Sequence, residues 1–264
     1  MSKFKNKTIW ITGASDGIGK EMAIQLAEKG ARIILTARNE EKLSAVQQSL
    51  AGEGHVVFPM DLLKTDEIPA ATEQLLAQVQ NIDVLVNNAG ISQRSLTKDT
   101  AISVDRKMME LDFFAVVILT KSLLPHMLQR KSGQIVTISS VAGIAGVPMR
   151  SAYCAAKHAV KGFMGSLRAE SYKDNLEVIV VTPGSIKTNI SKNALEGDGK
   201  KHGTTDPAIA NGIPVDQCVK KIVRGMERGE PEILIANSKE RAVVMLRRFF
   251  PKQLFKVLRN IKTT

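Results

Sequence analysis

Short apolar runs alternate with longer amphipathic stretches through most of this chain. The apolar runs predict strands at residues 8–11, 32–36, 55–60, 82–86, 134–139, 176–182 and 232–236. Helical spacing predicts helices between them, at 17–28, from 39 onward, 102–129, 151–169 and 215–228. The strands are apolar throughout, which is typical of parallel strands that are covered on both faces. Seven strand–helix alternations predict a single-domain α/β fold, a doubly wound seven-stranded parallel sheet with helices on both faces.

The length of 264 residues suits one large domain, and no repeat or internal boundary is visible. We predict a catalytic domain at residues 1–238 and a basic amphipathic tail at 239–264. Within the domain, residues 185–212 are rich in Gly, Pro, Asn and Lys and predict a long loop or lid.

Several classes of protein are disfavoured by composition. No uninterrupted apolar run reaches about 18 residues, so we expect no membrane-spanning helix. The basic start of the chain lacks the apolar core of a secretion signal. Cys154 and Cys218 lie far apart without metal-ligand spacing, so we expect reduced thiols and no metal site. These features predict a cytoplasmic protein.

A glycine-rich turn joins the first strand to the first helix. Gly13, Gly17 and Gly19 would permit a sharp exit from the strand, close approach of a pyrophosphate and packing of the helix on the sheet. The helix N-terminus adds amide donors and partial positive charge. This placement favours a nucleotide site over a plain turn.

The end of the second strand indicates which nicotinamide cofactor is used. A carboxylate there would bind the ribose hydroxyls of NAD(H), but the chain has Ala37 and Arg38. A guanidinium can bind a 2′-phosphate through two hydrogen bonds, so we predict NADP(H) over NAD(H). The alternative is a solvated arginine at a helix start. Asp61, after the third strand, is placed to bind the adenine amino group.

Tyr153 and Lys157 are candidates for acid–base chemistry. Their spacing puts them on one face of a helix, one turn apart. The ammonium would stabilise the phenolate, and Ser140 at the end of the preceding strand could hydrogen-bond the same substrate oxygen. A Tyr-x-x-x-Lys pair alone also occurs on ordinary helix faces, so the other motifs decide the interpretation.

Taken together, the motifs resemble those of the short-chain dehydrogenase/reductase family over about residues 6–236. The matching segments are Thr12-Gly13-x-x-x-Gly17-x-Gly19, Asn87-Asn88-Ala89-Gly90, Ser140, Tyr153-x-x-x-Lys157 and Pro183-Gly184. Residues 119–127 and Arg150-Ser151-Ala152-Tyr153 are similar to the subgroup that includes the dehydrogenase/reductase member 7 type and the 11β-hydroxysteroid dehydrogenases.

The resemblance implies a Rossmann fold and an oxidoreductase that transfers hydride between NADP(H) and a carbonyl or secondary alcohol. Tyr153 would be the general acid or base, Lys157 its partner, and Ser140 would polarise the carbonyl. The implied cofactor-binding residues are Gly13, Ser15, Asp16, Gly17, Ile18, Gly19, Arg38, Asp61, Leu62, Asn87, Ala89, Gly90, Tyr153, Lys157, Pro183, Gly184, Ile186 and Thr188.

Asp112 departs from the family pattern, which usually has an asparagine in this helix. That asparagine holds a water next to the lysine through its backbone carbonyl, at a helix irregularity. If the backbone does this work, Asp112 is tolerated; otherwise its carboxylate pairs with Lys157 and shifts the pH optimum. We therefore include Asp112 among the catalytic candidates.

The predicted substrate pocket is apolar. Ser140, Val141, Met149 and Tyr153 are its candidate residues, and Ile144, Val147 and Ile186 add apolar surface. A lipophilic carbonyl compound therefore fits better than a sugar, although apolar loop residues also serve simply to pack.

Positive charge is concentrated in the tail. The chain carries a formal charge of +11, and residues 239–264 hold eight cations against one anion, Glu240. Apolar residues from Val243 to Ile261 are interleaved with these cations, and Pro251 should split the segment into two helices. The pattern predicts peripheral association with an anionic membrane surface; docking on the domain or on a second subunit is the alternative.

Two other functions are disfavoured by the residues of this chain. A non-catalytic NADP(H)-binding regulatory protein would not need Ser140, Tyr153 and Lys157 together. A nucleic-acid binder is disfavoured because aromatic residues make up only 4% of the chain and the cations gather in an apolar tail. By analogy with the family, we expect a homodimer or homotetramer formed through the helices that hold Phe113 and Phe163.

Overall fold

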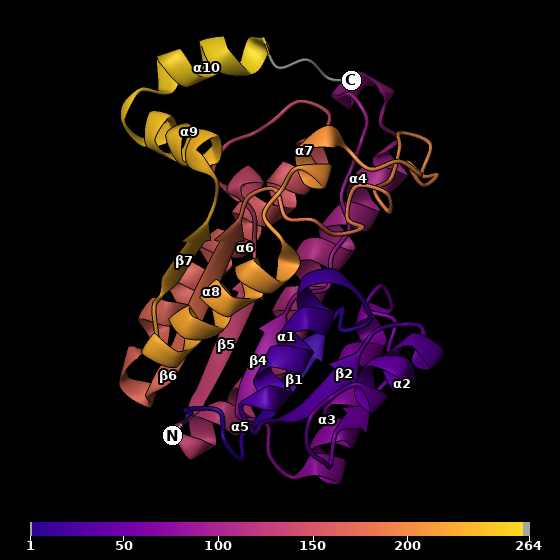
Figure 1. Cartoon of the computed structure of the whole chain (residues 1–264), viewed down its shortest axis with the longest axis vertical. Helices are drawn as coiled ribbons and strands as arrows, with labels where there is room; N and C mark the ends of the chain where they lie inside the picture. Colours follow the sequence, from indigo (N-terminus) through magenta and orange to yellow (C-terminus); the bar gives the residue numbers. More distant parts are fainter. Residues whose placement is uncertain (1, 261–264) are drawn as a thin grey trace.

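The computed structural model describes residues 2–260 and contains one seven-stranded parallel sheet (Figure 1). Its strands lie in the order β3-β2-β1-β4-β5-β6-β7. Their bounds are β1 (Thr8–Thr12), β2 (Arg32–Thr36), β3 (Val56–Val57), β4 (Val84–Asn87), β5 (Gly133–Ile138), β6 (Leu176–Pro183) and β7 (Glu232–Ile235). This confirms the predicted fold class.

Helices cover both faces of the sheet because neighbouring residues of each strand point in opposite directions. On β1, Ile9 and Ile11 join one apolar core, while Trp10 joins the other. The first core includes α1 (Gly17–Glu28), α2 (Glu40–Gln48) and α8 (Val215–Arg228). The second includes α3 (Ile68–Val79), α5 (Ala115–Arg130) and α6 (Ser151–Glu170).

The third strand is shorter than the predicted 55–60. The amide of Ile33 donates to the His55 ring instead of to a backbone carbonyl, at 3.0 Å. Beyond β3, Phe58 and Met60 still donate backbone hydrogen bonds toward the second strand and the residue after it. The chain is therefore extended there, but only Val56 and Val57 form a regular ladder.

The predicted helix at 102–129 is one continuous helix with an irregular turn inside it. It comprises α4 (Ile102–Met109), the π-helical turn η3 (Glu110–Phe114) and α5. By length and composition alone, this 29-residue helix is long and apolar enough to cross a membrane, and it is the one such helix within residues 2–260. Its residues Leu119, Leu123 and Met127 pack in the core beside the sheet, as in the core helices of many soluble proteins.

Two further segments, a long loop and the tail, lie beyond the carboxyl edge of the sheet (Figure 1). The long segment 185–212 is loop apart from the short helix α7 (Pro207–Ala210). The tail forms α9 (Ser238–Phe249) and α10 (Pro251–Arg259), so Pro251 does separate two helices. Ile261, which belongs to the predicted apolar pattern of the tail, lies outside the described residues.

The tail is attached to the domain through Glu240. Its Oε1 accepts a hydrogen bond from the Ser185 amide at 2.6 Å, and its Oε2 accepts one from the Asn237 amide at 3.0 Å. A Cβ on Gly184 would overlap this carboxylate, so a larger residue there would displace the Glu240 side chain. The first tail helix is thereby fixed to the turn that follows β6.

Asp83 is a buried carboxylate at the opposite, amino edge of the sheet. It accepts a hydrogen bond from the Thr8 amide at 3.0 Å and pairs with Arg130 at 3.1 Å and Lys7 at 3.3 Å. Burial alone would raise the pKa of Asp83, but these hydrogen bonds and charges outweigh it and lower the pKa below 3.8. The carboxylate therefore stabilises the fold above that pH.

We expect Asp83→Asn to lower the free energy of unfolding by about 1–3 kcal/mol at neutral pH, because the buried site loses the charge that pairs with Arg130 and Lys7. Because the folded-state pKa is depressed, the carboxylate's contribution is present above the unfolded-state pKa and is lost as the pH falls through the folded-state value. Urea unfolding should therefore show the same difference between wild type and variant at pH 7 and pH 5, and a smaller difference at pH 3. A difference that stays constant with pH would contradict this assignment.

Candidate active site

A large cavity lies at the carboxyl edge of the sheet. Its volume is about 1310 Å³, and residues that follow β1, β2, β4, β5 and β6 line it, together with parts of the 185–212 loop and the tail. The strand order reverses direction between β1 and β4, which is where open α/β sheets bind their ligands. The cavity has room for a dinucleotide together with a second molecule.

The glycine turn forms one wall of the cavity. Gly13 and Gly17 have φ of +64° and +54°, values that favour glycine. The Asn88 side-chain amide donates to the carbonyls of Thr12 and Gly13 at 2.9 and 3.2 Å, which fixes the turn against the end of β4. A Cβ on Gly13 would lie 2.9 Å from both Asn88 Nδ2 and Ala89 Cα. Because the backbone packs this closely and carries no side chain at Gly13, a pyrophosphate could approach the backbone amides of the turn.

Most of the predicted cofactor-binding residues line this cavity. They are Gly13, Ser15, Asp16, Gly17, Ile18, Arg38, Asp61, Leu62, Ala89, Gly90, Tyr153, Lys157, Pro183, Gly184, Ile186 and Thr188. Asn87 is an exception, because its side chain is buried and donates to Thr120 Oγ1 at 3.1 Å; its neighbour Asn88 faces the cavity. Gly19 also stays outside the lining and instead packs tightly on Gly13 and Asn88.

Two exposed cations stand at the end of the cavity beyond β2. Arg38 follows Ala37 as predicted, and Lys42 on the first turn of α2 lines the same region. Lys42 was not among the predicted cofactor-binding residues. It lies four residues after Arg38, and Asn39 caps the start of the helix between them.

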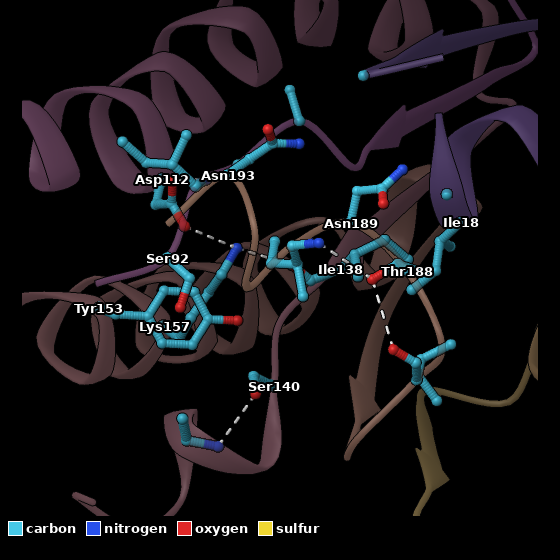
Figure 2. A pocket seen from close by; sticks show the side chains of 18 of the residues that line it. Ile18, Ser92, Asp112, Ile138, Ser140, Tyr153, Lys157, Thr188, Asn189 and Asn193 are labelled. Atoms are coloured by element: carbon cyan, nitrogen blue, oxygen red, sulfur yellow. Dashed lines mark hydrogen bonds and ion pairs between the residues drawn. The ribbon is translucent and has the colours of Figure 1, made fainter. Parts of the chain in front are cut away.

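The four catalytic candidates all line the cavity. Tyr153 and Lys157 come from the first turns of α6, and Lys157 Nζ lies 5.7 Å from the centre of the Tyr153 ring. Ser140 follows β5, and its hydroxyl accepts a hydrogen bond from the Ala142 amide at 3.1 Å. Figure 2 shows these side chains in one part of the pocket, with a dashed line that joins Asp112 to Lys157.

The Asp112 carboxylate forms an ion pair with Lys157 inside the protein. The π-helical turn carries Asp112, which has no exposed surface, and its Oδ2 lies 3.2 Å from Lys157 Nζ (Figure 2). Its Oδ1 accepts a hydrogen bond from the Ile91 amide at 2.9 Å, and Lys157 also donates to the Ile138 carbonyl. Of the two alternatives given for Asp112, the structure therefore shows the one in which its carboxylate pairs with Lys157.

Burial and charge act against each other in this pair. Burial raises the pKa of Asp112 above its ordinary value, although the Lys157 charge opposes this. Burial would lower the pKa of Lys157, but the Asp112 charge, then Tyr153, outweigh it and raise that pKa. Lys157 therefore stays an ammonium at neutral pH, while the nearby carboxylate weakens the field that it exerts on Tyr153.

We expect Asp112→Asn to move the pH–rate profile of alcohol oxidation about one unit or more toward acid. With the carboxylate gone, the Lys157 charge is less compensated and favours the phenolate at lower pH. Initial rates with NADP+ from about pH 5 to 10 would measure the shift. Glu110→Gln is the matched control, because Glu110 lies in the same turn but bonds Thr65. An unchanged profile in Asp112→Asn would show that the carboxylate does not influence the acid–base group.

The part of the cavity next to Tyr153 is partly apolar and partly charged. Val141, Val147, Met149 and Ile186 line it as predicted, whereas Ile144 does not. The lining of the cavity also includes charged residues that were not predicted, among them Arg94, Arg150, Asp206 and Glu240. Arg150 had been noted only as part of the subgroup motif, and no local signal pairs Arg94 with a carboxylate from the distant loop.

The comparisons with known proteins agree with the motifs. A family model described as short chain dehydrogenase matches residues 7–199. A Drosophila melanogaster protein named dehydrogenase/reductase SDR family protein 7-like is 38% identical, over 97% of this chain and 82% of that protein. This confirms the similarity to the member 7 type.

Solved structures show the same fold with nicotinamide cofactors bound. A short-chain dehydrogenase from Sphingobium yanoikuyae in complex with NADPH is 27% identical, covers 97% of this chain and 96% of its own, and has a TM-score of 0.78. A Burkholderia phymatum protein in complex with NAD has a TM-score of 0.82 at 19% identity, with 97% of each chain covered, which shows the fold alone.

The chain thus matches these proteins in sequence and fold over almost its whole length. It also has a tyrosine, a lysine and a serine at the carboxyl edge of the sheet, beside a glycine turn. The chain belongs to the short-chain dehydrogenase/reductase family.

Proposed function

We propose that this protein is an NADP(H)-dependent oxidoreductase that interconverts a lipophilic carbonyl compound and its secondary alcohol. The observation that carries the proposal is the convergence of Ser140, Tyr153 and Lys157 on the cavity that begins at the glycine turn. Membership of the family supports an oxidoreductase. The residues that line the cavity support NADP(H) as the cofactor and a lipophilic carbonyl compound as the substrate.

The cofactor fits the residues that are present. Gly13 and Gly17 leave the backbone bare where phosphates approach, and the turns before Ala89 and after Pro183 would hold the nicotinamide end. Ile186 and Thr188 both line the cavity where the carboxamide would bind. When bound, the cofactor supplies or accepts the hydride.

The protein's own residues handle the proton. In carbonyl reduction the Tyr153 hydroxyl gives its proton to the substrate oxygen, and in alcohol oxidation the phenolate takes a proton from the alcohol. The Lys157 ammonium stabilises the phenolate, while Ser140 donates a hydrogen bond to the substrate oxygen and holds it in place. Apolar residues such as Val147 and Met149 exclude water from this region.

The preference for NADP(H) rests on the two cations after β2. Arg38 and Lys42 would bind a 2′-phosphate, and the described lining near Ala37 has no carboxylate in the position where a ribose hydroxyl pair would be accepted. The Sphingobium relative with NADPH is consistent with this choice.

A panel of ketones, aldehydes and secondary alcohols tests the proposal. NADPH oxidation and NADP+ reduction, followed at 340 nm, should show turnover with lipophilic members of the panel and much less with sugars. Tight NADPH binding, measured by fluorescence, without turnover of any member would favour the alternative of a non-catalytic regulatory protein.

We further propose that the tail binds an anionic membrane surface from the cytoplasmic side. Met245, Phe249, Phe250 and Phe255 are each at least half exposed, whereas Leu254 is fully buried against the protein. The exposed apolar residues are accompanied by cations on both helices, which is the composition of a helix that lies on anionic lipid.

We expect the full chain to float with liposomes that contain phosphatidylserine, and to float less with purely zwitterionic liposomes or at high salt. The double variant Phe249→Ser/Phe250→Ser should lose most of the flotation without changing the tail's charge, while Tyr172→Ser, at another highly exposed aromatic residue, is the control. Equal flotation of full chain and a chain ending near Ser238, or flotation of neither, would contradict a membrane role for the tail.

A further inference from the structure

Two arginines share one carboxylate in the part of the cavity that faces Tyr153. Asp206, from the 185–212 loop, accepts from Arg94 Nε at 2.7 Å and also from Arg94 Nη2. Arg150 Nη2 lies 3.3 Å from the same oxygen, Oδ2. All three residues line the cavity, so two positive charges meet one negative charge there.

Arg94 is a fixed member of this group. Its side chain is only 7% exposed, and its Nη1 donates to the Gln93 carbonyl at 2.6 Å and to Ser92 Oγ at 3.3 Å. Burial would raise the pKa of Asp206, but the hydrogen bonds and charge of Arg94, then the charge of Arg150, outweigh it and lower that pKa. Asp206 is therefore ionised at neutral pH, and because two guanidinium groups surround this one carboxylate, the three side chains together keep a net positive charge.

Arg150 is the second cation, and most of its hydrogen-bonding capacity is unused. Within residues 2–260, its side chain makes only the 3.3 Å contact with Asp206, which leaves the donors on Nε and Nη1 available to a ligand. Burial and the Arg94 charge lower the pKa of Arg150, yet a guanidinium remains protonated at neutral pH.

The position of Arg150 points it toward the reacting end of a substrate. It occupies the N-cap position of α6, three residues before Tyr153, and both residues line the cavity. Met149, Leu195 and Ile209 supply apolar surface to the same region of the cavity. A half-buried cation with apolar neighbours favours a ligand that has an anionic group and an apolar part.

We propose that Arg150, held in place by Asp206 and backed by Arg94, is an anion-binding subsite, and that the carbonyl substrate carries a carboxylate or a phosphate group. This rests on the proposed function for the carbonyl itself, but the anion site is testable by binding alone. The competing role for Arg150 is purely structural, as one of two clamps that hold the loop over the cavity.

Binding to the NADP+-loaded protein tests the subsite without turnover. Isothermal titration calorimetry would compare a medium-chain keto acid, its methyl ester, and a keto alkyl phosphate of the same length. We expect the two anions to bind at least about tenfold more tightly than the ester, because a charge-assisted hydrogen bond contributes about 1.5–3 kcal/mol. The order of the two anions identifies which headgroup the site prefers.

Arg150→Met should remove this preference. We expect the affinity for the anions to fall about tenfold or more and that for the ester to change less than about threefold. Lys107→Met, which removes a charge from the same cavity but has no contact with Asp206, is the matched control. If Arg150 only clamps the loop, Arg150→Met should lower the affinities for the two anions and the ester alike. If Lys107→Met lowers the affinity for the anions as much as Arg150→Met does, the preference comes from the overall positive charge of the cavity. Either result overturns the proposal.

Turnover separates this proposal from the proposed function. If the wild type reduces the keto acid with NADPH, and Arg150→Met lowers kcat/KM mainly by raising KM, the result supports both the anion subsite and the reductase function. Anion-selective binding without turnover of any ketone would sustain the subsite and contradict the reductase. Turnover of the ester at the same efficiency as the acid would contradict the subsite and sustain the reductase.

Discussion

Tyr153→Phe is expected to lower carbonyl reduction by about 10³-fold while NADPH binding persists. General acid–base catalysis contributes about 10²- to 10⁴-fold, and phenylalanine removes the proton without removing the ring. The ring is 8% exposed and packs with Met108, Ala142 and Ala152, so phenylalanine preserves the wall of the cavity. Steady-state rates at 340 nm together with NADPH fluorescence titration measure the two effects separately.

Tyr172→Phe is the matched control for this substitution. Tyr172 is the other tyrosine of the chain, is 82% exposed and does not line the cavity, so its loss should leave the rate within about twofold. Retention of most activity in Tyr153→Phe would remove Tyr153 from the chemistry, and loss of NADPH binding would show that the variant damaged the cofactor site instead.

Arg38→Ala is expected to lower kcat/KM for NADPH by about 10- to 100-fold and to change that for NADH by less than about threefold. The charge-assisted hydrogen bonds to the 2′-phosphate account for this range, because NADH has no phosphate there. Arg38 is exposed and no hydrogen bond in the described structure ties its side chain to the fold, so the substitution should not disturb stability.

Lys42 allows a sharper version of this experiment. The double variant Arg38→Ala/Lys42→Ala should reverse the cofactor preference, while Arg248→Ala removes an exposed charge from the tail and controls for total charge. Equal efficiency of NADPH and NADH in the wild type, or an unchanged NADPH efficiency in Arg38→Ala, would show that the enzyme does not select its cofactor at this position.

Much of the fold was predictable because a buried parallel strand leaves a local signal. The second strand and α8 have the predicted bounds, since Arg32 and Val215 each begin an unbroken apolar or amphipathic pattern. The third strand was overestimated because His55 and Phe58 look like strand residues, whereas side-chain bonding by His55 interrupts the ladder. The extra residue of a π-helical turn also leaves no mark in the hydrophobic spacing around Asp112.

The parts of the site that lie within one short segment of the sequence were predictable, whereas the parts formed by two distant segments were not. The glycine turn and the Tyr153–Lys157 pair are local motifs, so the sequence places them correctly at the cavity. Arg94 and Asp206 are 112 residues apart, and only the fold brings them together. Asn87 and Asn88 are chemically identical, and the direction of each side chain at the end of β4 decides which one faces the cavity.

The contact between Glu240 and the turn at Gly184 and Ser185 joins the tail to the segment that we expect to hold the nicotinamide end of the cofactor. If docking of α9 favours the turn geometry that accepts the carboxamide, bound cofactor must favour docking by the same factor, because linkage is reciprocal. Anything that draws the last two helices away, a lipid surface included, would then weaken cofactor retention, so the enzyme's occupancy would depend on where in the cell it resides.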